Sequence, residues 1–150
     1  MTDVKFQQIN LNDNDIVGHF CEYLQLGSSL LYLELSGCHL QAKHLMLIAE
    51  QLVENTTLRV LDLSGNGTSD LVDENHICQA LFLQSLRKFI AGNDELYSLN
   101  LQGLLLGKKL LFLIDTIKGS KSLLQVNLTH NLFNKYDEAY IFEQLGILPK

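Results

Sequence analysis

The stretch LRVLDLSGNGT, residues 58–68, alternates apolar and polar side chains before it runs into glycine and asparagine. Similar stretches are LLYLELSGCHL (30–40), LYSLNLQGLLL (96–106) and LLQVNLTHNLF (123–133), with a degraded copy, FQQINLNDNDI, at residues 6–16. All five share apolar residues at positions 1, 4 and 6, and asparagine, cysteine or an apolar residue at position 9; position 11 is apolar in four copies and Thr68 in the fifth. Internal repeats with a period of roughly 20 to 50 residues indicate a stack of similar structural units.

Each unit is predicted to be a short strand, a turn and a helix. In residues 30–57, Leu33 and Leu35 alternate with polar or amphipathic side chains, which is typical of a half-buried strand. From 41 to 53 the apolar residues recur at helical spacing. Because no unit can bury its apolar face alone, we expect the strands to stack in parallel, with the helices on the opposite side.

The unit that begins at Leu58 is longer than the others. We place its extra residues in the acidic stretch 67–76, followed by a helix over 74–91 that a left-handed Gly92 would close. A rival register starts a strand at Leu86, but that residue lies too close to Leu96 for two successive units. Residues 133–150 are interpreted as the C-terminal cover, with a helix at about 134–146 that ends at Gly146.

Length and charge restrict the classes of partner. The 150 residues predict a single domain spanning 1–150. Residues 1–75 carry eleven acidic and three basic side chains, a net charge of −8, whereas residues 76–150 carry six and eight, a net charge of +2. An acidic half repels the phosphate backbone, so we expect a protein partner and no nucleic acid.

Neither a membrane nor an oxidising compartment is expected. No apolar run approaches the roughly 18 residues that a membrane span needs, and the N-terminal residues do not resemble a secretory signal. The three cysteines, Cys21, Cys38 and Cys78, are odd in number and widely spaced, which favours a reducing, cytoplasmic location.

The sequence offers little catalytic chemistry. The five histidines do not cluster, and there is neither a glycine-rich phosphate loop nor a cysteine pair with zinc-ligand spacing. Cys38 occupies a buried repeat position and is interpreted as an inert thiol. We therefore expect a protein that is not an enzyme and that has no cofactor and no metal.

The five copies resemble the leucine-rich repeat family, and specifically its ribonuclease-inhibitor-like class with long, helix-containing repeats. The resemblance spans about residues 6–135 and implies an α/β solenoid, a short horseshoe with parallel strands on the concave face and helices on the convex face. In that family an asparagine or cysteine at position 9 bonds the backbone of neighbouring turns. Asn14, Cys38, Asn66 and Asn131 match this role, and Leu104 departs from it.

Members of this class commonly bind proteins on the concave strand face. Strand alternation identifies the outward side chains, with Asn10, Glu34, Asp62, Asn100 and Asn127 expected in the central row. Such a face is also polar simply because it is solvated. The candidate partner-binding residues are Tyr32, Glu34, Arg59, Asp62, Tyr97, Asn100 and Asn127 on the face, with Asp70 and Asp73 in the acidic insertion at its rim.

The favoured hypothesis is a non-enzymatic recognition module that acts as an adaptor, an inhibitor or a secreted effector. One version resembles the small leucine-rich-repeat effectors that intracellular bacteria deliver into the host cytosol. The alternative is a regulatory or substrate-recognition fragment of a larger enzyme, such as a ubiquitin ligase or a GTPase activator. A third hypothesis is a homodimer formed through an unprotected N-terminal edge at residues 6–11.

Overall fold

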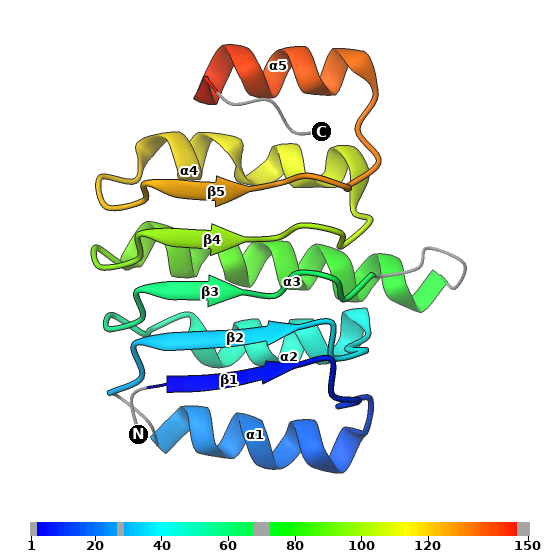
Figure 1. Ribbon diagram of the computed structural model, residues 1–150, viewed down its shortest axis with the longest axis vertical. Helices are drawn as coiled ribbons and strands as arrows, with labels where there is room; N and C mark the ends of the chain where they lie inside the picture. The colour runs from blue at the N-terminus through cyan, green and yellow to red at the C-terminus, as the bar shows by residue number, and fades with distance from the viewer. Residues whose placement is uncertain (1–2, 27–28, 68–72, 147–150) are drawn as a thin grey trace.

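A single five-stranded parallel sheet organises the chain. The computed structural model describes residues 3–26, 29–67 and 73–146, with no description of the side chains of 73–75. The sheet order is β1-β2-β3-β4-β5, so neighbours in the sequence are neighbours in space (Figure 1). The strands are β1 (Asp3–Gln7), β2 (Tyr32–Ser36), β3 (Val60–Asp62), β4 (Ser98–Asn100) and β5 (Gln125–Asn127).

Helices cover one face of this sheet and leave the other face open. Figure 1 shows α2, α3 and α4 behind the strands, with α1 and α5 at the two ends of the row. Each strand is thus followed by a helical segment, which makes the fold α/β, as the sequence predicts. The segments are α1 (Asn14–Leu26), α2 (Ala42–Leu52), α3 (Asp73–Gly92), the 3₁₀ helix η1 (Gly107–Leu113), α4 (Ile114–Gly119) and α5 (Lys135–Leu145).

The core lies between the two layers and consists largely of the repeated leucines. Leu33 pairs in register with Leu61, and Leu61 pairs with Leu99, and all three are buried. Helix α2 contributes Leu45 and Ile48 from the opposite layer. Burial of apolar area at about 25 cal/mol per Å² is the main term that favours folding.

The register predicted for the first unit is wrong by five residues. Val4 pairs with Leu33 and Phe6 with Leu35, so Phe6 occupies position 6 of the repeat rather than position 1. Gln8 adopts a left-handed φ of 58°, equivalent to Gly37 at 61°, and therefore ends the strand before Ile9. Asn10 consequently lies beyond β1 instead of in the central row, and the N-terminal edge strand is Asp3–Gln7 rather than residues 6–11.

The long third helix rules out the rival register, because Leu86 is buried within α3. The predicted role of Gly92 is wrong: it ends α3 without a left-handed φ, and the side chain of Asn93 closes the turn instead. Gly146 does adopt the left-handed conformation at the end of α5, with a φ of 71°. The insertion residues 68–72 lie outside the described part of the chain.

Two buried asparagines, Asn66 and Asn131, tie the turn after a strand to the preceding unit. Asn66 Oδ1 accepts hydrogen bonds from the backbone N–H groups of Cys38 and Leu40, both at 3.0 Å. Asn66 Nδ2 donates to the carbonyl oxygens of Leu35, at 2.8 Å, and Leu63, at 2.9 Å. One side chain therefore satisfies buried donors and acceptors of two consecutive units.

Asn131 repeats this arrangement between the last two units, where its Nδ2 donates to Leu101 O at 2.8 Å and its Oδ1 accepts from Leu106 N–H at 3.3 Å. The thiol of Cys38 donates a hydrogen bond to the carbonyl oxygen of Phe6. Asn14 does not take part in this series, contrary to prediction, because it begins α1. Leu104 fills the equivalent position with a buried apolar side chain, as its sequence suggests.

A buried histidine joins the first two helices. His44 Nδ1 accepts from the backbone N–H of Gln41 at 3.1 Å, which places the ring proton on Nε2, 2.9 Å from Asn14 Oδ1. Burial lowers the pKa of His44, the nearby Lys43 ammonium lowers it further, and Asp13 acts in the opposite direction. The folded protein therefore favours the neutral form of this ring.

We predict that Asn66→Ala lowers the free energy of unfolding by about 3 kcal/mol, because it leaves buried N–H and C=O groups of two units without partners. Urea denaturation measures the change. The exposed Asn12 provides the control, since Asn12→Ala should change stability by less than about 0.5 kcal/mol. Equal effects of the two substitutions would contradict the structural role of Asn66.

We also predict that stability falls as the pH drops through the ordinary histidine pKa of about 6.5. The unfolded chain takes up a proton in that range that the folded protein resists at His44, so acid favours unfolding. The stability that neutral His44 contributes is complete above the ordinary histidine pKa and is lost as the pH falls below it. Denaturation at a series of pH values should show a smaller slope for His44→Gln, whereas His19→Gln, at an exposed histidine, should keep the slope of the parent protein.

Candidate functional site

The open face of the sheet presents outward side chains in parallel rows. Strand register aligns Lys5 with Glu34, Glu34 with Asp62, Asp62 with Asn100 and Asn100 with Asn127. We name these five residues the central row. Lys5 therefore stands where the sequence led us to expect Asn10, as a consequence of the shifted first register.

Three members of the central row also close the ends of their own strands. Asp62 Oδ1 accepts from Ser64 N–H at 2.9 Å, Asn100 Oδ1 from Gln102 N–H at 3.0 Å, and Asn127 Oδ1 from Thr129 N–H at 3.0 Å. Each side chain thus makes a local turn to the backbone two residues on. These side chains are therefore held in fixed positions. A substitution that tests binding must keep the side-chain oxygen that accepts the backbone hydrogen bond.

Lys5 offsets part of the acidity predicted for this face. Its Nζ lies 3.7 Å from Glu34 Oε2 and 5.3 Å from the centre of the Tyr32 ring. More than half of the Lys5 side chain remains exposed, so the ion pair adds little stability. The face therefore carries a basic group beside Glu34 and Asp62, which makes it less acidic than the sequence suggests.

A second row lies just before the strands, and we name it the leading row: Leu31, Arg59, Tyr97 and Leu124. Its backbone forms a ladder, with Arg59 N–H donating to Leu31 O at 2.7 Å, Tyr97 N–H to Arg59 O at 2.9 Å and Leu124 N–H to Tyr97 O at 2.9 Å. Tyr97 is exposed, and the side chain of Leu124 is 81% exposed. The row therefore presents an aromatic and an aliphatic side chain on a hydrogen-bonded backbone.

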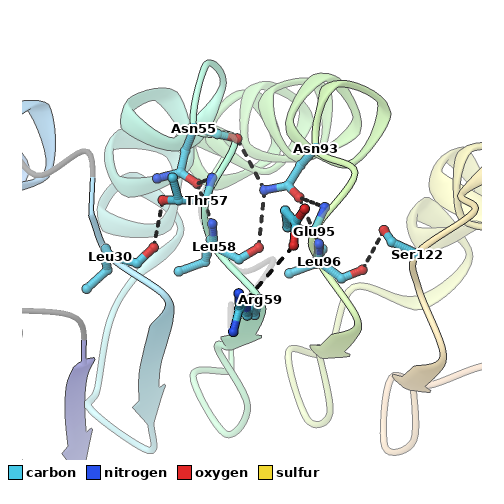
Figure 2. A network of polar contacts seen from close by, with 9 residues as sticks. All are labelled: Leu30, Asn55, Thr57, Leu58, Arg59, Asn93, Glu95, Leu96 and Ser122. Carbon is cyan, nitrogen blue, oxygen red and sulfur yellow. Dashed lines mark hydrogen bonds and ion pairs between the residues drawn. The ribbon is translucent and has the colours of Figure 1, made fainter.

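Side-chain amides bond to the backbone just before the leading row, as Figure 2 shows for Asn93. Asn93 Nδ2 donates to the carbonyl oxygens of Asn55 and Leu58, both at 3.2 Å. Asn93 Oδ1 accepts from the N–H groups of Glu95 and Leu96, both at 2.7 Å. Because Asn93 is buried, it anchors the start of one repeat to the start of the previous one.

Neighbouring units use related contacts. Asn55 Oδ1 accepts from Leu58 N–H at 2.8 Å, and Thr57 Oγ1 donates to Leu30 O at 2.8 Å. Ser122 Oγ makes the equivalent bond to Leu96 O at 2.8 Å (Figure 2). The network extends to the leading row itself through an ion pair between Arg59 and Glu95, at 4.0 Å.

Sequence reasoning missed this network. The available signal is a polar residue three positions before the first leucine of a repeat: Asn55 before Leu58, Asn93 before Leu96 and Ser120 before Leu123. Such residues favour a turn that bonds to the backbone two or three residues on. Leu124 and Lys5 are two further surface residues that lie outside the predicted set of partner-binding residues.

The structure brings seven of the nine predicted partner-binding residues onto one continuous surface. The remaining two, Asp70 and Asp73, cannot be placed there: Asp70 and the side chain of Asp73 lie outside the described residues. On the open face are Tyr32, Glu34, Asp62, Asn100 and Asn127, and in the leading row are Arg59 and Tyr97.

Within residues 3–26, 29–67 and 73–146, no group of three or more histidine, cysteine or acidic side chains is arranged to hold a metal ion. No helix within the same ranges combines the length and apolar character of a membrane span.

Comparison with solved structures identifies the fold. Actin-binding site 2 of leiomodin-1 aligns with a TM-score of 0.65 and 17% identity, over 96% of this chain and 80% of that one. The C-terminal domain of tropomodulin from Caenorhabditis elegans aligns with a TM-score of 0.68 and 16% identity, over 97% and 83%. This chain shares their leucine-rich-repeat-like fold. No protein-family model matches the sequence, and no curated protein does.

These matches correct the more specific resemblance drawn from the repeats. The assignment to the ribonuclease-inhibitor-like class, and to small bacterial effectors, is wrong: the structures described above are a leiomodin and a tropomodulin domain. The repeat pattern is related only loosely to the class that the sequence suggested. At this level of identity the comparison establishes the fold and leaves function to the surface itself.

We predict that Asn93→Ala loosens the leading row and lowers the free energy of unfolding by about 2–4 kcal/mol, because two buried carbonyls and two N–H groups lose their partner. Denaturation gives the stability, and hydrogen exchange should be faster at the amides of Leu96 and Tyr97. Asn93→Asp keeps the acceptor oxygen but sets a buried carboxylate oxygen against the carbonyl oxygens of Asn55 and Leu58, so it should not restore the lost stability. Unchanged exchange at both amides in Asn93→Ala would show that the network does not hold this row.

Proposed function

We propose that this chain is a non-enzymatic recognition module that binds a protein through the open strand face together with the leading row. The proposal includes a sheet that curves as a short horseshoe solenoid, with this face on the concave side. It also includes a reducing, cytoplasmic setting, in keeping with the free thiols of Cys21, Cys38 and Cys78.

The observation that carries this proposal is the exposure of Tyr97 and Leu124 on a backbone that hydrogen bonds hold in place. An aromatic or aliphatic side chain that is presented rigidly loses little conformational entropy on binding, and such residues often dominate binding energy. The polar central row beside them supplies hydrogen-bonding groups for the rim of an interface.

The size of the surface explains why both rows take part. Five strands at a spacing of about 4.8 Å span roughly 20 Å, whereas a stable interface covers about 800 Å² on each partner. The central row alone offers less than that area. A partner that contacts the central row and the leading row together approaches it.

Actin is the first partner to test. The leiomodin-1 domain that shares this fold is described as an actin-binding site, which makes actin a protein that this architecture is known to accommodate. A role as an adaptor or an inhibitor follows from binding alone and needs no catalytic group. No observation favours the alternative of a fragment of a larger enzyme.

We predict that the parent protein binds actin and that the double substitution Tyr97→Ala/Leu124→Ala weakens binding at least about 30-fold, the loss of one strong contact of about 2 kcal/mol. Co-sedimentation tests filamentous actin, and fluorescence anisotropy tests monomeric actin. Phe112→Ala is the matched control, because Phe112 is an exposed aromatic residue, at 46% against 36% for Tyr97, that lies on η1 among the helices. Its affinity should equal that of the parent protein.

A second variant separates charge from shape. Glu34→Gln/Asp62→Asn removes two charges while Asn at position 62 keeps the oxygen that accepts from Ser64 N–H. Binding that depends on these acids should lose much of its salt dependence in this variant.

Two outcomes count against the proposal in different ways. Undiminished binding of Tyr97→Ala/Leu124→Ala would place the actin site elsewhere on the chain. Absence of actin binding would exclude actin as the partner, and capture from a eukaryotic lysate would follow, comparing the parent protein with the same double variant. Identical captured proteins in that comparison would contradict a recognition function for this surface.

A further inference from the structure

Helix α3 is longer than the helices beside it and exposes apolar side chains. It has 20 residues, against 11 in α2, seven in η1 and six in α4. Figure 1 shows its N-terminal end reaching past α2. Ile77, near that end, is 66% exposed, and Leu81, one turn later, is 40% exposed. The outer surface of the helix layer therefore carries apolar side chains along the first half of α3.

A groove with a volume of about 480 Å³ lies between α3 and η1, and we name it the α3–η1 groove. Leu83 of α3 is buried in its floor, whereas Phe112 of η1 is 46% exposed, so an apolar floor adjoins an accessible apolar wall. Binding sites are commonly concave and largely apolar, with a few polar groups. The lining of this groove includes Ala80, Leu81, Leu83 and Phe112, with His76 and Lys109 among its polar residues.

Contacts between α3 and η1 hold the two walls of the groove in place. The Arg87 guanidinium lies over the Phe112 ring, with its central carbon 4.8 Å from the ring centre. Lys109 Nζ lies 3.2 Å from His76 Nδ1 and donates to Oε1 of the buried Gln79. Because these contacts exist before a partner arrives, an occupant does not have to order the groove as it binds.

The walls of the groove are basic. Between residues 76 and 92, α3 carries Arg87 and Lys88 and no acidic residue, and η1 carries Lys108 and Lys109 and none. Among the ion pairs of the described residues, none involves Arg87, Lys88 or Lys108. An occupant that carries carboxylates therefore meets complementary charge here.

The basic stretch is limited in length. Beyond Arg87, the next cavity along α3 is lined by Asp94 and Asp115, which repel carboxylates. The basic groove therefore extends from His76 to Arg87, a rise of about 16 Å along α3. That distance equals about three turns of a helix.

The α3 wall presents its side chains in a straight row. Ala80, Leu83, Gln84 and Arg87 recur at i, i+3, i+4 and i+7, which is one side of the helix. A second helix laid along such a row meets it with its own side chains at the same spacing. The lining comes from α3 and η1 and contains no strand, so an extended peptide would find no sheet edge to pair with.

We propose that the α3–η1 groove binds an acidic amphipathic helix of a partner protein. The apolar side chains of that helix pack between Leu83 and Phe112, and its carboxylates face Arg87 and the lysines of η1. The groove lies among the helices, whereas Tyr97 and Leu124 directly precede strands, so this site is separate from the one proposed for actin. The inference therefore does not depend on actin binding.

Stapled helical peptides of about 12 residues test the proposal. Their apolar positions i, i+4 and i+7 vary among leucine, isoleucine, phenylalanine and methionine, and glutamate occupies the flanks. A matched set carries lysine in place of glutamate. Fluorescence anisotropy with the whole chain should give micromolar dissociation constants for the best acidic peptides, because three turns cover less than the roughly 800 Å² per partner of stable complexes. The matched basic peptides should bind at least about tenfold more weakly.

Two substitutions in the groove, each with a matched control elsewhere, locate the bound peptide. Phe112→Ala and Arg87→Glu should each weaken binding of the acidic peptides at least about tenfold. Arg87→Lys keeps the charge and should recover most of the affinity that Arg87→Glu loses. Phe142→Ala, at a phenylalanine of α5 that is 51% exposed, and Lys135→Glu, at an exposed lysine of the same helix, should leave the affinity unchanged. Circular dichroism confirms that every variant is folded.

The same variants separate this site from the actin site. Phe112→Ala should lose the peptide and keep the actin affinity of the parent protein, whereas Tyr97→Ala/Leu124→Ala should keep the peptide. If the parent protein does not bind actin, the peptide result still stands, because it is measured without actin.

Four results would overturn the proposal. Absence of binding by every acidic peptide would show that the groove takes no such helix. Equal affinities for the acidic and basic sets would remove the role of charge. Binding that is unaffected by Phe112→Ala and Arg87→Glu would place the peptide elsewhere on the chain. Failure of the peptides, together with binding to phosphatidylserine vesicles or self-association that Phe112→Ala abolishes, would assign the groove to a membrane surface or to a second copy.

Discussion

Buried asparagine side chains between consecutive β–α units are the interaction on which the rest of the structure depends. Because the strands are parallel, the turns of consecutive units lie side by side. The backbone N–H and C=O groups of these turns therefore lose contact with water. Asn66 and Asn131 satisfy these groups after the strands, and Asn93 does so before them. A carboxamide suits the task because it offers an acceptor and two donors at once.

The same hydrogen bonds connect stability with recognition. Asn93 bonds to the backbone of Leu58 and Leu96, the residues that directly precede Arg59 and Tyr97, so the leading row is part of the scaffold rather than a mobile loop. In the central row, Asp62 and Asn100 use one oxygen on their own strand ends and direct the rest of the side chain outward. A surface built in this way changes little in shape when it binds, which favours specificity over adaptability.

The two ends of the stack differ in how they are covered. At the C-terminal end, α5 buries Ile141 and packs Leu145 against the core, Phe133 packs there from the segment before the helix, and a left-handed Gly146 ends the helix. At the N-terminal end the described residues leave Phe6 and Ile16 exposed. A stack of repeats needs a cover at both ends because each unit buries only the faces that touch its neighbours.

The sequence by itself determined the repeated strand–helix units, since the alternation at Leu61 and Leu63 and the helical spacing in α2 are properties of a few consecutive residues. It did not determine the first register, because Val4 and Phe6 alternate no better than Ile9 and Leu11, and only pairing with Leu33 decides between them. The sequence also did not determine that Lys5 lies beside Glu34, or that Asn93 bonds to Asn55 across 38 residues. Register and cross-unit hydrogen bonds depend on residues far apart in the chain, so only the tertiary structure decided them.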